Sequence, residues 1–210
     1  MISDYITLLK AKIFEYNDGY VRISVAELAK LHPRKSYLYE LFNAYGFKAW
    51  NDIESLLEGS SGKEVRSKTH RLVKNRSHLL LEEFSEKTLG KFFIQQDETE
   101  IEVPLRLLIS EVNEMEVTDK NILYADKSTL KYPLVVRKWK KGDYFYPFGM
   151  SGRKKLSKYF KDEKVDIISK GKQWLLCSGD EIVWVIGKRT DQRFSVTEKT
   201  KKIVKFTVHT

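Results

Sequence analysis

The sequence predicts an α+β protein with an N-terminal short-helix segment, a β-rich linker and a C-terminal mixed α/β domain. Three observations support this prediction. Apolar residues recur at helical spacing in the first part of the chain, and they alternate with polar residues in the middle part. In the last part, one short basic helix lies among several strand-like runs. We therefore expect modules covering residues 1–60, 61–128 and 129–210.

The first module contains four short segments that carry helix signals, beginning with SDYITLLKAKIFEY. In SVAELAKL, Ser24 and Glu27 have the spacing of a capping box. KSYLYELFNAYG gathers its apolar residues on one face and ends at Gly46. In NDIESLLEG, Asn51 is the expected cap and Gly59 the expected stop.

The remaining elements are mostly predicted strands. Residues 61–83 alternate and carry a turn at residues 75–77, which predicts a hairpin. KFFIQQDETEIEV and RLLISEV continue the β pattern of the linker. In the last module we expect a strand at LVVRKW, a hairpin in QWLLCSGDEIVWVIG and a final strand at KIVKFTV.

Charge is distributed unevenly along the chain. The net charge is +9 over 210 residues. Residues 1–132 hold 19 Lys and Arg against 21 Asp and Glu, a net charge of −2, whereas residues 133–210 hold 19 against 8, a net charge of +11. An anionic partner is therefore expected to meet the last module.

The cysteine content and the lack of targeting or membrane segments indicate the cellular compartment in which the protein is expected. Cys177 is the only cysteine, so no intrachain disulfide can form and a reducing compartment fits. It lies in the apolar run QWLLC, which favours a core position over a reactive thiol. The sequence shows no signal peptide and no apolar run of about 20 residues, so we expect a cytoplasmic protein that does not enter a membrane.

Motifs of enzyme active sites are missing from this sequence. The four histidines have no metal-ligand spacing and there is no CxxC, so we expect no metal site. His70 and His78 fall on the predicted hairpin, where a structural role is favoured. GSSGK at residues 59–63 is too short for a phosphate-binding loop, and GxSxG and GxGxxG do not occur. We assign no catalytic residue to this chain.

The stretch DYFYPFGMSGRKKLSKYF, residues 143–160, places three cations where a helix is expected to begin. Cations are unfavourable in a first helical turn unless an anion neutralises them. Nearby glycines, Gly149 and Gly152, would leave backbone N–H groups available to the same anion. The alternative is a solvated surface helix, with Leu156, Tyr159 and Phe160 on its buried face.

Further cations and aromatic residues surround this stretch. Arg137, Lys138, Lys140 and Lys141 precede it, and Lys188, Arg189 and Arg193 follow the next apolar strand. The interleaved rings are Trp139, Tyr144, Phe145, Tyr146 and Phe148. Most of these rings are expected to fill the core, whereas Tyr144 and Tyr146 are candidates for stacking on unpaired bases.

Residues 133–200 resemble the C-terminal domain of the tRNA(Ile)-lysidine synthase family. The family pattern runs Pro-Leu, Arg, Gly-Asp, Pro-x-Gly-Met, Gly-x-Lys-Lys-Leu, Ile-x-Trp-Val, Gly-x-Arg and Arg-Phe. The matching positions are Pro133, Leu134, Arg137, Gly142, Asp143, Pro147, Gly149, Met150, Gly152, Lys154, Lys155, Leu156, Ile182, Trp184, Val185, Gly187, Arg189, Arg193 and Phe194. SGKEVRSKTHRLVKNRSHLLL is also similar to the family's linker into that domain.

The resemblance implies a function. The family uses ATP and Mg²⁺ to join lysine to the wobble cytidine of the tRNA(Ile) whose anticodon is CAU, and its C-terminal domain holds the tRNA body and acceptor stem. The catalytic PP-loop motif, Ser-Gly-Gly-x-Asp-Ser, is absent here, so we expect the C-terminal part of a longer ligase, with no cofactor of its own. A homodimer is left open. With the charge pattern, the resemblance assigns tRNA contacts to Arg137, Lys140, Lys141, Tyr144, Arg153, Lys154, Lys155, Lys158, Arg189 and Arg193.

One departure and two alternatives accompany this hypothesis. Where many family members have Pro and Arg after Lys-Val, this chain reads KVDIISKGK, so Lys170 and Lys172 would have to supply that charge. One alternative is a stand-alone nucleic-acid-binding protein with a helix-turn-helix at residues 24–58, although that segment lacks a basic recognition helix. The other is a protein-interaction module in which the lysines only solvate the surface.

Overall fold

The computed structural model describes residues 2–17, 19–84 and 90–209, and the α+β class is confirmed. The chain divides into two compact units. Unit 1 comprises Met1–Lys87 with Asp166–Ile168, and unit 2 comprises Thr88–Val165 with Ser169–Thr210. Within the described residues, no helix is long and apolar enough to cross a membrane.

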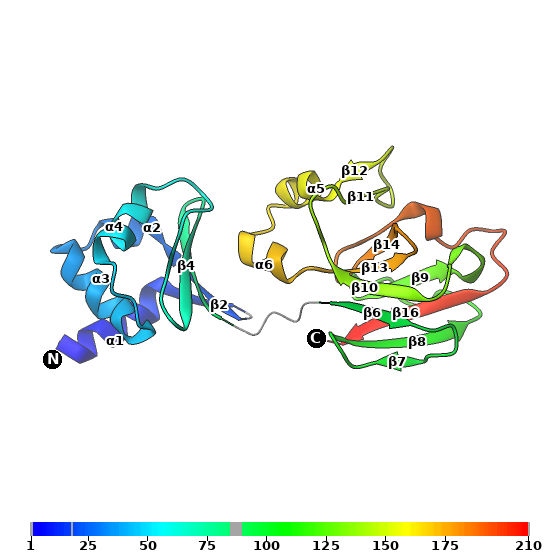
Figure 1. Ribbon diagram of the computed structural model, residues 1–210, viewed down its shortest axis with the longest axis horizontal. Helices are drawn as coiled ribbons and strands as arrows, with labels where there is room; N and C mark the ends of the chain where they lie inside the picture. The colour runs from blue at the N-terminus through cyan, green and yellow to red at the C-terminus, as the bar shows by residue number, and fades with distance from the viewer. Residues whose placement is uncertain (1, 18, 85–89, 210) are drawn as a thin grey trace. The chain divides into compact units, whose positions relative to one another are not determined.

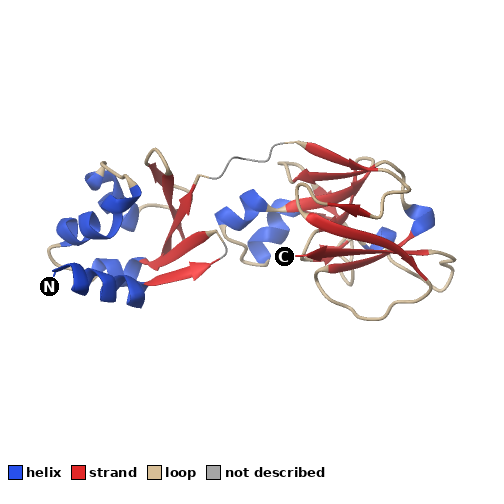
Figure 2. Cartoon of the chain, turned by 90° about the horizontal axis from the view of Figure 1, so that it is seen from below, coloured by secondary structure: helices blue, strands red, loops and turns tan. Residues whose placement is uncertain are grey.

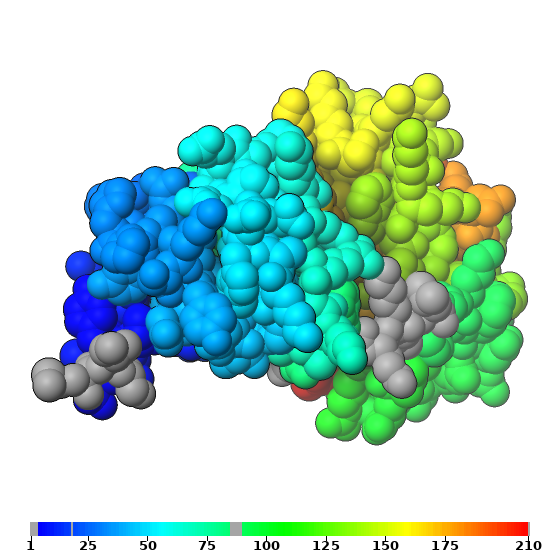
Figure 3. Space-filling model, turned by 60° about the vertical axis from the view of Figure 1, so that its left-hand side comes forward, coloured from blue at the N-terminus to red at the C-terminus, as the bar shows by residue number. Residues whose placement is uncertain are grey.

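Unit 1 is a helical layer on one antiparallel sheet. Its strands follow the order β1-β2-β5-β4-β3, and Figure 2 shows the helices gathered on one side of them. Side chains of α3 and α4 lie beside each other on the outer surface, blue and cyan in Figure 3. The bounds are α1 Ile2–Ile13, β1 Phe14–Asn17, β2 Tyr20–Ser24, α2 Val25–Ala29, α3 Arg34–Phe42, η1 Asn43–Tyr45, α4 Trp50–Glu58, β3 Glu64–Arg66, β4 His70–Asn75 and β5 His78–Glu83.

Most local signals in unit 1 are confirmed. The Ser24 hydroxyl accepts a hydrogen bond from the Glu27 backbone N–H, and Gly46 ends η1 with a φ of 77°. The hairpin of β4 and β5 turns at Arg76 and Ser77, as expected. The cap predicted at Asn51 is wrong, because α4 begins at Trp50 after Ala49. The strands β1 and β2 were not predicted, because the first helical segment was extended to Tyr16 and no element was assigned to residues 17–23.

Unit 2 contains two larger sheets and a small hairpin. Their strand orders are β15-β14-β13-β10-β6, β7-β8-β16-β9 and β11-β12. The bounds are β6 Lys91–Ile94, β7 Glu100–Ile101, β8 Arg106–Val112, β9 Ile122–Asp126, η2 Lys127–Thr129, β10 Leu134–Lys138, β11 Tyr144–Phe145, β12 Lys154–Lys155, α5 Leu156–Asp162, α6 Ile167–Lys172, β13 Trp174–Ser178, β14 Glu181–Val185, β15 Arg189–Thr190, η3 Gln192–Phe194 and β16 Ile203–His209.

The sheet containing β10 and β13 is the middle layer of unit 2 (Figure 1). Because side chains alternate along a strand, its two faces carry different residues. Leu134, Val136 and Leu176 pack toward the sheet of β8, β9 and β16 in one core cluster. On the other face, Leu175 and Cys177 pack under α5 and β11 in a second cluster. The hairpin β11-β12 is therefore held against a largely apolar cluster.

The two units differ from the three modules expected from the sequence. The strands β3, β4 and β5 belong to the predicted linker but complete the sheet of unit 1. The linker strands β8 and β9 instead flank β16, with Phe206 opposite both Ile109 and Leu123. These pairings join residues far apart in the sequence, so local composition could not reveal where the units divide.

The basic helix begins later than expected. Its predicted first turn contained Arg153, Lys154 and Lys155, but α5 starts at Leu156 and the last two of these cations form β12. The cause is strand pairing, since β12 pairs with β11 and the Leu156 backbone N–H donates to the Asp143 carbonyl at 2.8 Å. The predicted apolar face is confirmed, because Leu156, Tyr159 and Phe160 are all buried.

Candidate nucleic-acid interface

The hairpin of β11 and β12 sets the positions of the basic residues. Tyr144 lies opposite Lys155 and Phe145 lies opposite Lys154. Cross-strand partners share a face of the sheet, so Tyr144 and Lys155 project to one side. Phe145 is completely buried and fixes the other side against the core. Because side chains alternate between the two faces of a strand, Lys154 lies on the opposite face from its sequence neighbours Arg153 and Lys155.

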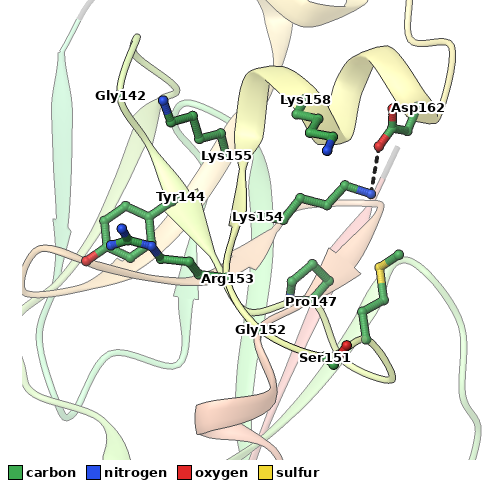
Figure 4. Close-up of a pocket in the computed structure, with 11 residues that line it drawn as sticks. Gly142, Tyr144, Pro147, Ser151, Gly152, Arg153, Lys154, Lys155, Lys158 and Asp162 are labelled. Atoms are coloured by element: carbon green, nitrogen blue, oxygen red, sulfur yellow. Dashed lines mark ion pairs between the residues drawn. The ribbon is translucent and has the colours of Figure 1, made fainter.

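The hairpin and α5 form the walls of an open cavity of about 550 Å³, which we call the cationic cavity (Figure 4). Four of its lining residues are cations and one is an acid. Its lining residues are Gly142, Tyr144, Pro147, Met150, Ser151, Gly152, Arg153, Lys154, Lys155, Lys158 and Asp162. The structure thus brings together five of the ten residues that the sequence assigned to tRNA contacts.

Asp162 is a member of the cavity that the sequence reading missed. Its carboxylate lies 2.9 Å from the Lys154 Nζ atom, as the dashed line in Figure 4 shows. The hydrogen bond from Lys154 lowers the pKa of Asp162. A signal was present, since Lys158 and Asp162 are four residues apart on one helix and therefore neighbours. Lys154 already has a counter-ion, whereas no carboxylate of the described residues forms an ion pair with Lys155 or Lys158.

Tyr144 is the exposed ring of this region, with 45% of its surface accessible. The Arg153 guanidinium lies over the ring, 5.2 Å from its centroid, and Figure 4 shows the two side chains together. Tyr146 packs edge to face against Tyr144 with the ring centroids 6.4 Å apart. The ring is therefore oriented on two sides while much of it remains accessible to a ligand.

A second cavity of about 330 Å³ adjoins the first, and we call it the mixed cavity. It is lined by Lys140, Lys141, Gly142, Asp143, Tyr144, Asp180, Glu181 and Arg193. Arg193 forms ion pairs with two carboxylates. It forms an ion pair with Glu181, and its Nη2 atom lies 2.8 Å from Oδ2 of the fully buried Asp191. Arg193 also lies over the Tyr146 ring at 4.4 Å, so the arginine braces the Tyr146 ring against the η3 turn.

Arg137 lines neither cavity. Its two Nη atoms donate to the two carboxylate oxygens of Asp143 at 2.8 and 2.9 Å. The side chains of Arg137 and Asp143 are 12% and 7% exposed. The hydrogen bonds to Asp143 raise the pKa of Arg137, which remains charged in its ion pair. The observed contacts of Arg137 are structural, holding the turn before β11 onto β10.

Arg189 belongs to a third cavity of about 400 Å³, which includes Lys188 and Phe148. Its Nη1 atom donates to the Phe148 carbonyl at 3.5 Å. Among the rings expected in the core, Phe148 is the exception, at 52% exposed, whereas Trp139 packs against Phe160. Lys170 and Lys172 contribute backbone carbonyl groups, which accept from Trp139 and Lys138 respectively.

The cationic cavity is suited to an anion with an aromatic part. Its lysines and Arg153 attract a phosphate, and the Tyr144 ring offers a stacking surface. Residues 59–63 link α4 to β3, so no helix follows that glycine-rich turn as a phosphate-binding loop requires. Within the described residues, no cluster of His, Cys, Asp or Glu could hold a metal ion.

The fold and the cavities define a two-unit α+β protein with a cation-lined surface site in its second unit. Two family profiles match the chain. The profile described as "TilS substrate binding domain" matches residues 16–84, and "TilS substrate C-terminal domain" matches residues 134–206. The first match falls within unit 1, and the second falls in unit 2 apart from residues 166–168, which belong to unit 1.

Curated relatives agree with these profiles. The tRNA(Ile)-lysidine synthase of Parabacteroides distasonis is 41% identical over 189 residues, which are 87% of this chain and 43% of the relative. That of Bacteroides thetaiotaomicron is 37% identical over 81% of this chain and 39% of the relative. A solved structure titled "Crystal structure of TILS C-terminal domain" has a TM-score of 0.49 and 16% identity, covering 57% of this chain and 97% of that one. The chain belongs to the tRNA(Ile)-lysidine synthase family and spans about 40% of the length of these relatives.

Proposed function

We propose that this chain is the tRNA-binding part of a tRNA(Ile)-lysidine synthase and holds the tRNA(Ile) whose anticodon is CAU. In the complete ligase, lysine would be joined to the wobble cytidine at the expense of ATP. This chain would hold the tRNA body and acceptor stem, and alone it would not catalyse the reaction. Its place of action would be the cytoplasm.

The observation that carries the proposal is the position of the cationic cavity. Arg153, Lys154, Lys155 and Lys158 all line one cavity, in the region matched by the C-terminal domain profile. Four cations against Asp162 give its wall a net positive charge. RNA phosphates would neutralise that charge and release condensed counterions, which favours binding most strongly at low salt.

ATP, Mg²⁺ and lysine would be bound by the catalytic part, which carries the PP-loop motif in this family. The sequence of this chain lacks Ser-Gly-Gly-x-Asp-Ser, so none of its residues is assigned to these ligands. Its contribution to the reaction would be to orient the substrate. Discrimination among RNAs would come mostly from shape and from unpaired nucleotides, because side chains cannot read the deep major groove of an RNA helix.

The test is equilibrium binding of the chain to tRNA(Ile) with the CAU anticodon across a salt series. Methionine tRNA and duplex DNA of equal charge serve as competitors. We expect preference for tRNA over duplex DNA and a steep fall of affinity with salt. Equal, weak affinity for all three nucleic acids would contradict the proposal, because charge alone would then account for binding.

A further inference from the structure

Two adjoining cavities share Tyr144 and Gly142 but differ in charge. The cationic cavity has four cations and one carboxylate on its wall. The mixed cavity has Lys140, Lys141 and Arg193 balanced by three carboxylates. A phosphate would therefore be attracted to the first cavity more strongly than to the second. A neutral group with hydrogen-bond donors is better suited to the second.

Tyr144 stands where the two cavities meet. Arg153, which lies over the ring, lines the cationic cavity and not the mixed one. The Tyr144 side chain therefore presents to the mixed cavity a surface that this cavity does not share with Arg153. A base that entered the mixed cavity would stack on this surface. Its 5′-phosphate would lie on the side of Arg153 and Lys155.

The sizes of the cavities fit one nucleotide, and stacking on Tyr144 favours an unpaired one. Their volumes, about 550 and about 330 Å³, lie in the range of small-molecule sites. A base inside a duplex is stacked on both sides and cannot place its ring on a protein tyrosine. Unpaired nucleotides can be splayed out and stacked on aromatic side chains. The site thus favours single-stranded RNA at an end or in a loop.

We infer that Tyr144 is the stacking platform of a site for one unpaired nucleotide. The phosphate binds between Arg153 and Lys155 in the cationic cavity, and the base occupies the mixed cavity. The inference rests on the proposed function, because it identifies which part of a tRNA enters this site. The unpaired nucleotide comes either from the single-stranded 3′ end or from a loop.

The mixed cavity also specifies a class of base. Of its three carboxylates, Asp143 is paired with Arg137 and Glu181 with Arg193. Asp180 forms no ion pair within the described residues, and it is exposed in the turn between β13 and β14. A carboxylate accepts hydrogen bonds and cannot donate one when ionised. Asp180 can therefore accept a hydrogen bond from an exocyclic amino group such as that of cytosine, whereas uracil presents a carbonyl at the same position.

The first test compares two RNA hairpins of equal charge. One carries a single-stranded 3′ overhang on a closed stem, and the other is a blunt stem with a tRNA-sized loop. We expect Tyr144→Leu to weaken binding of one of these by about tenfold and to leave the other unchanged. The hairpin that responds identifies the source of the nucleotide. An equal loss on both hairpins, or no loss on either, would overturn the inference.

Controls separate this outcome from failure of the proposed function. Phe93→Leu removes another exposed ring of unit 2, 56% accessible and outside both cavities, and should not change either affinity. Thermal melting of Tyr144→Leu checks that the unit remains folded. If the unaltered chain binds tRNA specifically but Tyr144→Leu behaves like Phe93→Leu, only the inference fails. If the unaltered chain does not prefer tRNA to duplex DNA, the proposed function fails as well.

The second test changes the base. Whichever hairpin responds to Tyr144→Leu is prepared with cytidine or with uridine at its unpaired positions. The unaltered chain should prefer cytidine by about tenfold. Asp180→Asn should abolish this preference, because its amide can donate to the uracil carbonyl as well as accept from an amino group. Equal binding of the two RNAs by the unaltered chain would overturn the assignment of Asp180.

Discussion

Arg137 and Asp143 form a bidentate ion pair beneath the turn that leads into β11, with both donor–acceptor distances under 3 Å. Asp143 also accepts a hydrogen bond from the Lys140 backbone N–H at 2.8 Å. One carboxylate therefore fixes both a strand and a turn. Arg137 was a candidate for tRNA contact from its charge and its motif, but its guanidinium is committed to this pair.

The first prediction concerns this ion pair. Arg137→Met should lower the free energy of unfolding by about 3 kcal/mol, because it leaves a buried carboxylate without its partner. Urea denaturation measures the change. Arg137→Met with Asp143→Asn should recover part of the loss, since Asn carries no charge and can still accept from Lys140. Full stability of Arg137→Met with weakened tRNA binding would instead show that Arg137 contacts RNA directly.

The second prediction concerns Arg193 and Asp191. The Asp191 carboxylate is fully buried and also accepts from the Tyr146 backbone N–H at 2.9 Å. Arg193→Lys should lower the free energy of unfolding by about 2 kcal/mol, because a lysine ammonium cannot donate to both carboxylate oxygens as the guanidinium does. An oxygen of the buried Asp191 carboxylate would then lack its hydrogen bond. Arg153→Lys is the matched control, since Arg153 is exposed, and it should change stability very little. Equal stability of the two variants would refute the structural role of Arg193.

The third prediction ranks the lysines of the basic stretch by the salt dependence of tRNA binding. Lys155→Ala should reduce the slope of log affinity against log salt by about 1, the value for one phosphate contact. Lys154→Ala should reduce it by less, because Asp162 already neutralises Lys154 and fewer counterions are released. Lys161→Ala on the same helix should have no effect, since Lys161 lines none of the three cavities described. Equal slopes for Lys155→Ala and Lys161→Ala would remove Lys155 from the interface.

The fourth prediction concerns the single cysteine. Burial raises the pKa of the Cys177 thiol to about 11 from an ordinary 9.0, and the residue is fully buried. At pH 8 the folded chain should react with iodoacetamide at least about 100-fold more slowly than the chain in concentrated urea, because thiolate is the reactive form. A rate within tenfold of the unfolded chain would contradict the buried position.

The raised pKa of Cys177 also makes the stability of the folded chain depend on pH. Between pH 9 and pH 11 the unfolded chain loses the thiol proton while the folded chain keeps it, so stability falls as the pH rises through this window. Cys177→Ala should remove this part of the fall. The measurement is the difference between the two unfolding profiles, which cancels the titration of lysines and tyrosines common to both.

The sequence alone determined the elements with strong local signals. The Ser24 cap, the turn at Arg76 and the buried face of α5 were predicted because each depends on a few neighbouring residues. The concentration of positive charge after residue 132 needed only counting, and the family pattern located the basic stretch.

Only the tertiary structure decided how these parts combine. Pairing with β11 turned Lys154 and Lys155 from a helical turn into a strand, which placed them on opposite faces of the hairpin. Folding then gave Lys154 a carboxylate partner in Asp162 and left Tyr144 accessible between two cavities. These outcomes depend on hydrogen bonds and contacts between distant segments. Sequence periodicity records which residues are buried, but not which distant strand or charge each one meets.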